Sequence, residues 1–214
     1  KQYGYYVLFT SLEEDERGYQ YNTAFIISPD GEIVASGKGS ESFSISIDSP
    51  VMWNDEVPAV YKLIIYAEGE VIPVLTALCK KEIKDKKFLI NGKSVFRRLV
   101  LDQGFYADGI YTAPTEEDLI RDIKLSMDLG FNGARLHEKI FEERFLYHAD
   151  KLGYLVWGEY PDWGLDHSRP ENIYAILPEW TEEIRRDFNH PSIIGWACQN
   201  EGYHCMVLDP AVIR

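Results

Sequence analysis

A carboxylate near the end of the sequence follows directly on an apolar run. The stretch NHPSIIGWACQNEGYH, residues 189–204, contains the apolar run from Ile193 to Ala197 and then Asn200 and Glu201. Such a run is typical of a buried strand, which puts Glu201 where the strand passes into a loop. A positioned carboxylate there can transfer protons to and from a reacting group. The alternative is that Glu201 only ends a strand and forms a salt bridge.

Predicted strands alternate with predicted helices from residue 88 to residue 214. The predicted strands are FRRLVLDQ, FNGARLH, YLVWGEY and IIGWACQN. The first helix, TEEDLIRDIKLSMDLG, has a Thr115 cap and an acidic first turn. Its apolar positions on one side are predicted to be Leu119, Ile123 and either Leu125 or Met127. Further helices are predicted in FEERFLYHADKLG, which ends at Gly153, in NIYAILPEWTEEIRRDFNHPS, and from Asp209 onward in DPAVIR. This alternation indicates βα units and a parallel sheet.

Each predicted strand of this half ends in polar residues. Asp102 and Gln103 end the first, Arg135 the second, Glu159 the third and Glu201 the fourth. In a βα barrel the active site is built on the face formed by the carboxyl ends of the strands. The pattern therefore favours a functional role for Glu201.

Residues 1–87 carry the signals of a β-sheet domain. YNTAFIISPDGEIVASG reads as two strands joined by a turn at 29–31, and ESFSISIDSP alternates apolar residues with serine. AVYKLIIYAEGEVIPVLTAL supplies two more strands around 68–69. Short strands at this spacing predict a β-sandwich.

Composition excludes several classes of protein. The chain is 45% hydrophobic and 14% aromatic, so it is neither disordered nor of low complexity. Its net charge of -13 argues against a nucleic-acid partner, which requires clustered Lys and Arg. No apolar run is long enough to span a membrane. The three cysteines, Cys79, Cys198 and Cys205, are too few for a disulfide framework and are interpreted as buried free thiols.

Four ordered stretches resemble glycoside hydrolase family 2, the group of β-galactosidases, β-glucuronidases and β-mannosidases. They are SPVMWNDEVPAVYKL, FLINGKSVFRRLV, TEEDLIRDIKLSMDLGFNGAR and RRDFNHPSIIGWACQNEG. The resemblance implies an immunoglobulin-like β-sandwich at residues 1–87. It also implies the first four βα units of a (β/α)8 TIM barrel at residues 88–214, an incomplete barrel. The function implied is that of a retaining exo-β-glycosidase, similar to a β-galactosidase.

The resemblance also implies roles for individual residues. Retaining hydrolysis of a glycosidic bond uses two carboxylates about 5–5.5 Å apart, one as acid/base and one as nucleophile. Glu201 matches the acid/base, and Asn200 matches the residue that binds the 2-hydroxyl of the sugar. Arg135 matches an arginine that supports the active site, with a structural ion pair as the alternative. His137 is expected to bind sugar or to be a solvated loop histidine, because the family's histidine position is Glu138 here.

Other matched positions are less specific. Glu159 is expected to line the pocket, or to serve in a helix cap or an ion pair. Asp102 and Gln103 stand at the end of the first strand, where many family members have an Asn-Arg-His run. Asp102 is nevertheless expected to contact sugar. Trp163 is a candidate platform for a sugar ring, whereas Trp196 is expected to pack in the core. We predict no metal and no other cofactor, because the ligands that bind magnesium in some galactosidases do not follow Glu159.

The resemblance also predicts what the chain does not contain. The family's nucleophile ends the seventh barrel strand, and a jelly-roll domain precedes the sandwich; neither has a counterpart here. We expect a middle piece of a larger glycosidase that is inactive alone. Its edge strands, 99–101 and 193–196, are expected to be exposed and to allow a homo-oligomer. A non-catalytic carbohydrate-binding module and a related barrel hydrolase acting on mannans or glucans are the alternatives. The bacterial cytoplasm and the periplasm both stay open.

Overall fold

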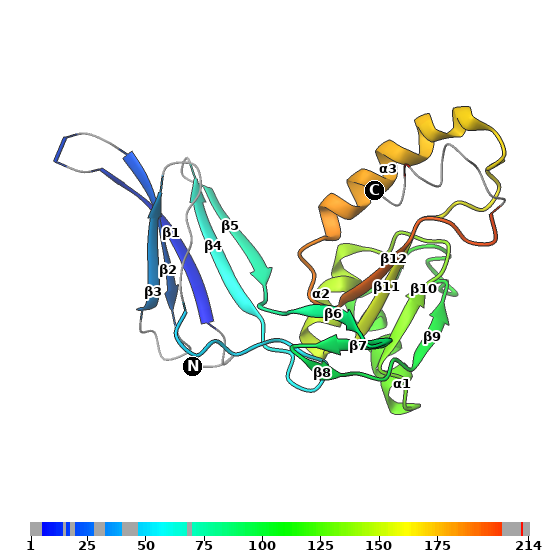
Figure 1. Ribbon diagram of the computed structural model, residues 1–214, viewed down its shortest axis with the longest axis horizontal. Coiled ribbons are helices and arrows are strands. Elements are labelled where there is room, and N and C mark those ends of the chain that lie inside the picture. Colours follow the sequence, from blue (N-terminus) through cyan, green and yellow to red (C-terminus); the bar gives the residue numbers. More distant parts are fainter. Residues whose placement is uncertain are drawn as a thin grey trace. The chain divides into compact units, whose positions relative to one another are not determined.

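The computed structural model describes residues 6–14, 16–17, 20–27, 33–39, 47–67, 70–202 and 211 (Figure 1). They belong to two compact units, Lys1–Cys79 and Lys80–Arg214. The boundary predicted between residues 87 and 88 falls inside strand β7 (Lys87–Ile90), which pairs with β6 (Lys81–Lys84) in the second unit. Asp85 and Lys86 join the two strands with φ of 49° and 60°, as a tight hairpin turn requires. The second unit therefore begins before β6.

The described strands of the first unit form one five-stranded sheet. They are β1 (Tyr6–Glu14), β2 (Gln20–Ile27), β3 (Ile33–Gly39), β4 (Tyr61–Ala67) and β5 (Glu70–Thr76), in the order β3-β2-β1-β4-β5. Among these described strands, only the β1–β4 pair is parallel. The immunoglobulin-like sandwich stays a prediction, because the described residues of this unit supply a single sheet.

Several predicted features lie outside the described residues. They include the turns at 29–31 and 68–69, most of the strand predicted in ESFSISIDSP, Cys205, and nearly all of the helix predicted from residue 209.

The second unit contains the predicted alternation of strands and helices. A small antiparallel sheet of β6, β7 and β8 (Lys93–Ser94) comes first. The parallel strands are β9 (Leu99–Asp102), β10 (Gly133–Leu136), β11 (Leu155–Glu159) and β12 (Ile193–Ala197). The helices between them are α1 (Glu116–Asp128), α2 (Glu143–Leu152), the short η1 (Pro170–Asn172) and α3 (Ile173–Asp187). In the order β12-β11-β10-β9, each strand lies next to the one that precedes it in the sequence, so the chain adds strands along one direction of the sheet (Figure 1).

Helix ends follow the local signals in the sequence. Thr115 caps α1 in a capping box with Asp118, and Gly153 ends α2 with φ of 74°, both as predicted. Of the two alternatives for the third apolar position, Met127 packs against the core, whereas Leu125 is 54% exposed. It lies two residues after the buried Ile123, and residues two apart on a helix do not share a face.

The core of the second unit lies on one face of its parallel sheet. Phe145 and Leu146 of α2 and Ile123 of α1 pack there with Ala134 and Val156 of the strands. On the other face, an open pocket of about 380 Å³ is lined by Leu99, Val100, Leu101, Arg135, Trp157 and Ala197. In β10 and β11, Ala134 and Val156 thus pack in the core, while the next residues, Arg135 and Trp157, line the pocket.

The two edge strands differ in exposure. Leu101 of β9 is 54% exposed, as expected, whereas Ile193 of β12 is only 6% exposed. Trp196 packs edge-on against Trp180 of α3 at 5.9 Å between ring centroids, which confirms its predicted core role. The homo-oligomer stays a prediction. Within the described part of the chain, no helix combines the length and apolar character needed to cross a membrane.

A buried aspartate fixes the segment that leads into β12. Asp150 of α2 is 1% exposed and lies 2.6 Å from His190 Nδ1. Its other oxygen accepts hydrogen bonds from the backbone N–H and the hydroxyl of Ser192, at 3.0 and 2.6 Å. Burial alone lowers the pKa of His190, but the hydrogen bond and charge of Asp150 outweigh burial and raise it. The start of β12, and with it the register of the strand that ends near Glu201, is therefore tied to α2.

Glu183 of α3 makes the stability of this unit dependent on pH. Its side chain is 5% exposed, and burial, then the charge of Asp187, raises its pKa from an ordinary 4.5 to about 8. The folded state therefore gains its full stabilisation from the protonated Glu183 below about pH 4.5. This stabilisation is lost as the pH rises toward 8 and the carboxyl ionises. Relative to Glu183→Gln, we expect the wild-type free energy of unfolding to fall by roughly 2 kcal/mol between pH 5 and pH 7. Urea unfolding at both pH values measures this difference. Parallel pH dependences of wild type and variant would contradict it.

Candidate active site

Arg135 connects the ends of three parallel strands. It lies on the pocket face of β10, and its Nε contacts Oε2 of Glu159 at the end of β11. Its Nη2 donates a hydrogen bond of 2.6 Å to Oδ1 of Asn200, three residues beyond the end of β12. The planar guanidinium can hold both groups at fixed angles because its donors are rigidly arranged. The structure thus brings together three residues that the sequence places far apart.

Glu159 is the buried member of this cluster. Its side chain is fully buried, and its Oε1 accepts a hydrogen bond of 3.2 Å from the backbone N–H of Glu138. The hydrogen bond to Glu159 is the main cause of the raised pKa of Arg135, and the charges of Glu138 and Glu201 add to it. The expectation that Glu159 lines the pocket needs correction, because a residue with no exposed surface cannot contact a sugar. Of the alternatives, its contacts match the ion pair.

Asn200 and Glu201 lie where the sequence predicts them, just after β12. The backbone N–H of Asn200 donates to Oδ1 of Asp162 at 2.9 Å. Glu201 is exposed and has a left-handed φ of 52°. A residue with a Cβ rarely adopts this conformation unless its surroundings impose it.

His137 and Asp102 lie beside the cluster, on the side of β9. The backbone N–H of His137 donates to the carbonyl of Asp102 at 2.8 Å, and its ring contacts Gln103 at 3.0 Å. Its Nε2 lies 3.9 Å from Oε1 of Glu159, and its side chain is 18% exposed, so it is not a solvated loop histidine. Asp102 accepts a hydrogen bond from Gly104, while burial raises the pKa of its carboxyl. Contacts of these two side chains with sugar stay predictions.

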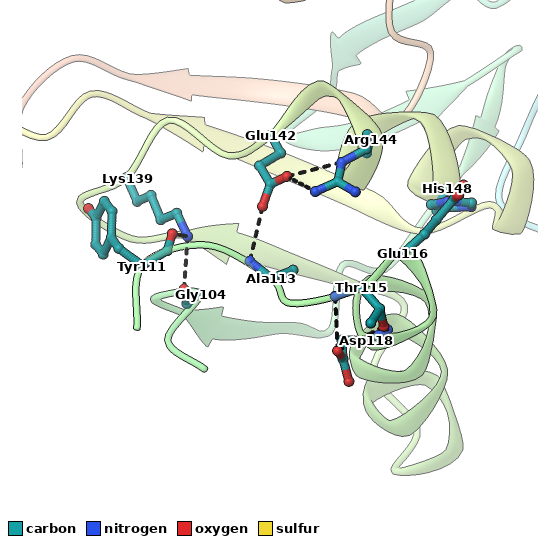
Figure 2. A network of polar contacts seen from close by, with 10 residues as sticks. All are labelled: Gly104, Tyr111, Ala113, Thr115, Glu116, Asp118, Lys139, Glu142, Arg144 and His148. Atoms are coloured by element: carbon teal, nitrogen blue, oxygen red, sulfur yellow. Dashed lines mark hydrogen bonds and ion pairs between the residues drawn. The ribbon is translucent and has the colours of Figure 1, made fainter. Parts of the chain in front are cut away.

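Figure 2 shows how the loop that follows Asp102 is held in place. Nζ of the buried Lys139 donates to the carbonyls of Gly104 and Tyr111, at 2.8 Å each (Figure 2). Glu142 accepts a hydrogen bond from the backbone N–H of Ala113 at 3.1 Å. Burial lowers the pKa of Lys139, whose ammonium lies 4.5 Å from the ring centroid of Tyr111. The loop from β9 to α1 is therefore attached to the loop from β10 to α2.

The aromatic candidates divide between core and surface. Trp163 is 70% exposed on the loop after β11, and its backbone N–H donates to Oε2 of Glu138 at 3.0 Å. Trp157 lines the pocket. Trp163 is open to solvent as a sugar platform requires, and that role stays a prediction.

Sequence reasoning missed three residues of the site. Glu138 has a left-handed φ of 55° and contacts the loop after β11 through Trp163. Asp162 and His167 lie on that loop and are 1% and 3% exposed. Burial, then the neighbouring carboxyl of Glu138, raises the pKa of Asp162 to about 6, against the opposing effects of Asn200 and His167. The polar loop YPDWGLDH after a buried strand was the available signal.

One group among the described residues has the composition of a metal site. Ligand atoms of His137, Glu138 and Glu159 lie within 4.8 Å of one another. However, the guanidinium of Arg135 already neutralises Glu159, and a cation would have to bind beside this fixed positive charge. The donor set therefore fits a metal poorly, and the absence of a metal stays a prediction.

Comparison with known proteins identifies the family. The profile of the family described as Glycosyl hydrolases family 2, TIM barrel domain, matches residues 81–212. The chain belongs to glycoside hydrolase family 2. Its parallel unit is accordingly a fragment of the family 2 TIM barrel, as the resemblance predicted.

Two relatives and one solved structure illustrate the similarity. The β-galactosidase of Streptococcus thermophilus is 30% identical over 197 residues, which cover 83% of this chain and 19% of that protein. The β-galactosidase of Lactococcus lactis subsp. lactis (strain IL1403) is 30% identical over 193 residues, covering 84% and 19%. A β-glucuronidase from Ruminococcus gnavus, solved in complex with D-glucuronic acid, has the same fold, with a TM-score of 0.73 and 19% identity over 92% of this chain and 37% of that chain. The chain spans about a fifth of the length of these two β-galactosidases.

Proposed function

We propose that this chain supplies the acid/base part of the active site of a retaining exo-β-glycosidase that resembles a β-galactosidase. The observation that carries the proposal is the contact of Arg135 with both Glu159 and Asn200, directly before Glu201. These residues gather at the carboxyl ends of parallel strands, the face on which barrel enzymes build their sites. Membership of a glycosyl hydrolase family supports the same reaction class.

Glu201 is proposed to act as the general acid and then as the general base. It first protonates the glycosidic oxygen as the leaving group departs, and it then removes a proton from the water that releases the sugar. Its exposed position is compatible with direct contact with substrate. The nucleophilic carboxylate that retention requires is proposed to lie outside this chain, which alone is expected to be inactive.

Asn200 is proposed to bind a hydroxyl of the sugar. Its Oδ1 accepts the hydrogen bond from Arg135, which fixes the plane of the amide and leaves the NH2 group as the donor toward substrate. A hydrogen bond from a fixed donor can strengthen as charge develops in the transition state. His137, Asp102 and Trp163 are proposed to complete the sugar site around it, and Glu159 to contribute only through Arg135.

The two kinds of relative name two different sugars. Seven of the eight sequence relatives compared are called β-galactosidases, whereas one of them, 32% identical to this chain, is called a putative β-glucuronidase, and the solved structure is called a β-glucuronidase. We propose a β-galactoside because most of the sequence relatives compared carry that name, including the one that matches over 197 residues. A non-catalytic carbohydrate-binding module has less support, because the matched family consists of glycosyl hydrolases.

Stereochemistry and substrate range test this function together. The protein encoded by the open reading frame that contains this chain is assayed with aryl β-galactoside, β-glucuronide, β-mannoside and β-glucoside as substrates. We expect hydrolysis of the β-galactoside, with the β-anomer as the first product in a proton NMR time course, because two displacements retain configuration. An α-anomer formed first would contradict retention. Hydrolysis of none of the four substrates would favour the binding module.

A further inference from the structure

Two buried polar residues lie on the loop between β11 and η1. Asp162 is 1% exposed and His167 is 3% exposed, although most of the residues between them are exposed. A buried carboxylate and a buried imidazole require compensating partners, because removing them from water is unfavourable. They contact each other, and both also contact the segment from Gln199 to Gly202, which contains the proposed acid/base.

Asp162 continues the pairing of β11 with β12 beyond the end of the strands. Backbone pairing ends where the N–H of Tyr160 donates to the carbonyl of Ala197 at 2.9 Å. The backbone N–H of Asn200, three residues after Ala197, instead donates to Oδ1 of Asp162, also at 2.9 Å. A side chain thus takes the place that a neighbouring strand would fill. The backbone of Asn200 is fixed here while its side chain is fixed by Arg135.

His167 supports Asp162 and packs against the next part of the same segment. Its Nε2 lies 2.9 Å from Oδ2 of Asp162, and its Nδ1 lies 3.4 Å from Nε2 of Gln199. The ring also packs directly against Gly202: a Cβ at that position would lie 2.0 Å from Nδ1 of His167. Only glycine leaves room for the ring, because any side chain would overlap it.

Glu201 stands between these two fixed points. Asn200 is bonded to Asp162, Gly202 is covered by His167, and Glu201 has the left-handed φ of 52°. A residue with a Cβ avoids this region unless neighbouring contacts hold it there. If either contact were lost, the backbone of Glu201 could return to a negative φ, which would redirect its carboxylate.

We infer that Asp162 and His167 are positioning residues that hold the backbone of Gln199–Gly202 and thereby aim Asn200 and Glu201. Neither residue is assigned contact with substrate, since both are buried. The consequence for catalysis rests on the proposed function, whereas the consequence for the backbone does not.

Hydrogen exchange at the amide of Asn200 tests the backbone contact directly. In the full chain, we expect Asp162→Ala to speed this exchange at least about tenfold, because the buried acceptor is lost. Asp162→Asn keeps an oxygen acceptor and is expected to retain the protection. The amide of Val156, bonded to the carbonyl of Ser192 at 2.8 Å, is the internal reference and is expected to be unchanged. Equal exchange at Asn200 in wild type and Asp162→Ala overturns the inference.

A second pair of variants leaves Asp162 unchanged. Gly202→Ala is expected to lower Tm, because its methyl group overlaps the ring of His167. In a His167→Ala background the same substitution is expected to lower Tm by clearly less, since the ring is gone. Equal losses of Tm in the two backgrounds would show that His167 does not restrict residue 202 and would overturn its part in the inference.

Kinetics connect the backbone contact to catalysis. In the protein encoded by the open reading frame that contains this chain, we expect Asp162→Ala to lower kcat about 10- to 100-fold and to change KM less than about twofold. Asp162→Asn is expected to restore most of kcat. A rise in KM with kcat unchanged would contradict a positioning role. If amide exchange responds as expected while the wild type hydrolyses no β-glycoside, the positioning contact stands and the proposed function fails.

Discussion

Glu201→Gln is expected to lower kcat at least about 10²-fold for a glycoside whose leaving group must be protonated. Glutamine keeps the size and polarity of the side chain but cannot donate the proton. The left-handed backbone at residue 201 is equally accessible to both side chains, so the variant is expected to fold as the wild type does. Steady-state kinetics with an alkyl and a dinitrophenyl glycoside of the same sugar measure the effect.

The dinitrophenyl substrate separates proton donation from other roles. Its leaving group departs without protonation, so the variant is expected to recover much of the first chemical step with it. Glu117→Gln, an exposed substitution on α1, is the matched control and is expected to behave as wild type. Because kcat/KM reports the first chemical step, equal losses of kcat/KM for both leaving groups would mean that Glu201 does not donate the proton. No loss for either would reduce it to the end of a strand.

The elements of the second unit could be predicted because their signals are local. The capping box of Thr115 and Asp118 and the left-handed Gly153 lie within one helical turn of the ends that they define. The strands were recognisable because each contains a short apolar run between polar or turn residues. The boundary predicted between residues 87 and 88 falls inside β7. Local signals do not show that β7 pairs with β6, which lies in the second unit.

The partners within the site could not be predicted from the sequence. Strand ends indicated which residues lie at the carboxyl ends of the parallel strands, but not that Arg135 would contact both Glu159 and Asn200. Such contacts depend on the stagger of neighbouring strands, which shifts between Val156 and Trp157 in the β11–β12 pair. Asp162 was missed for a similar reason, since a loop carries no periodic pattern and its burial results from tertiary packing.

Arg135→Met is expected to lower the free energy of unfolding by about 3–5 kcal/mol, because it leaves the fully buried Glu159 without its cation. Methionine has a similar length and packs against the same apolar pocket wall. Urea unfolding of the full chain measures the loss. Arg144→Met is the matched control, because the Arg144–Glu142 pair lies at the surface, where solvent screens it, and is expected to contribute little to stability. A loss as small as that of the control would mean that Glu159 is not held as an ion.

The double variant Arg135→Met/Glu159→Met separates the structural pair from the support of the active site. Replacing both members removes the unpaired buried charge, so stability is expected to return close to that of the wild type. The activity of the encoded protein is expected to stay low, because Asn200 has still lost the donor that orients its amide. Recovery of both stability and activity would make the pair purely structural. Recovery of stability alone would show that Arg135 acts through Asn200, so that the same guanidinium neutralises a buried carboxylate and orients the residue before the proposed acid/base.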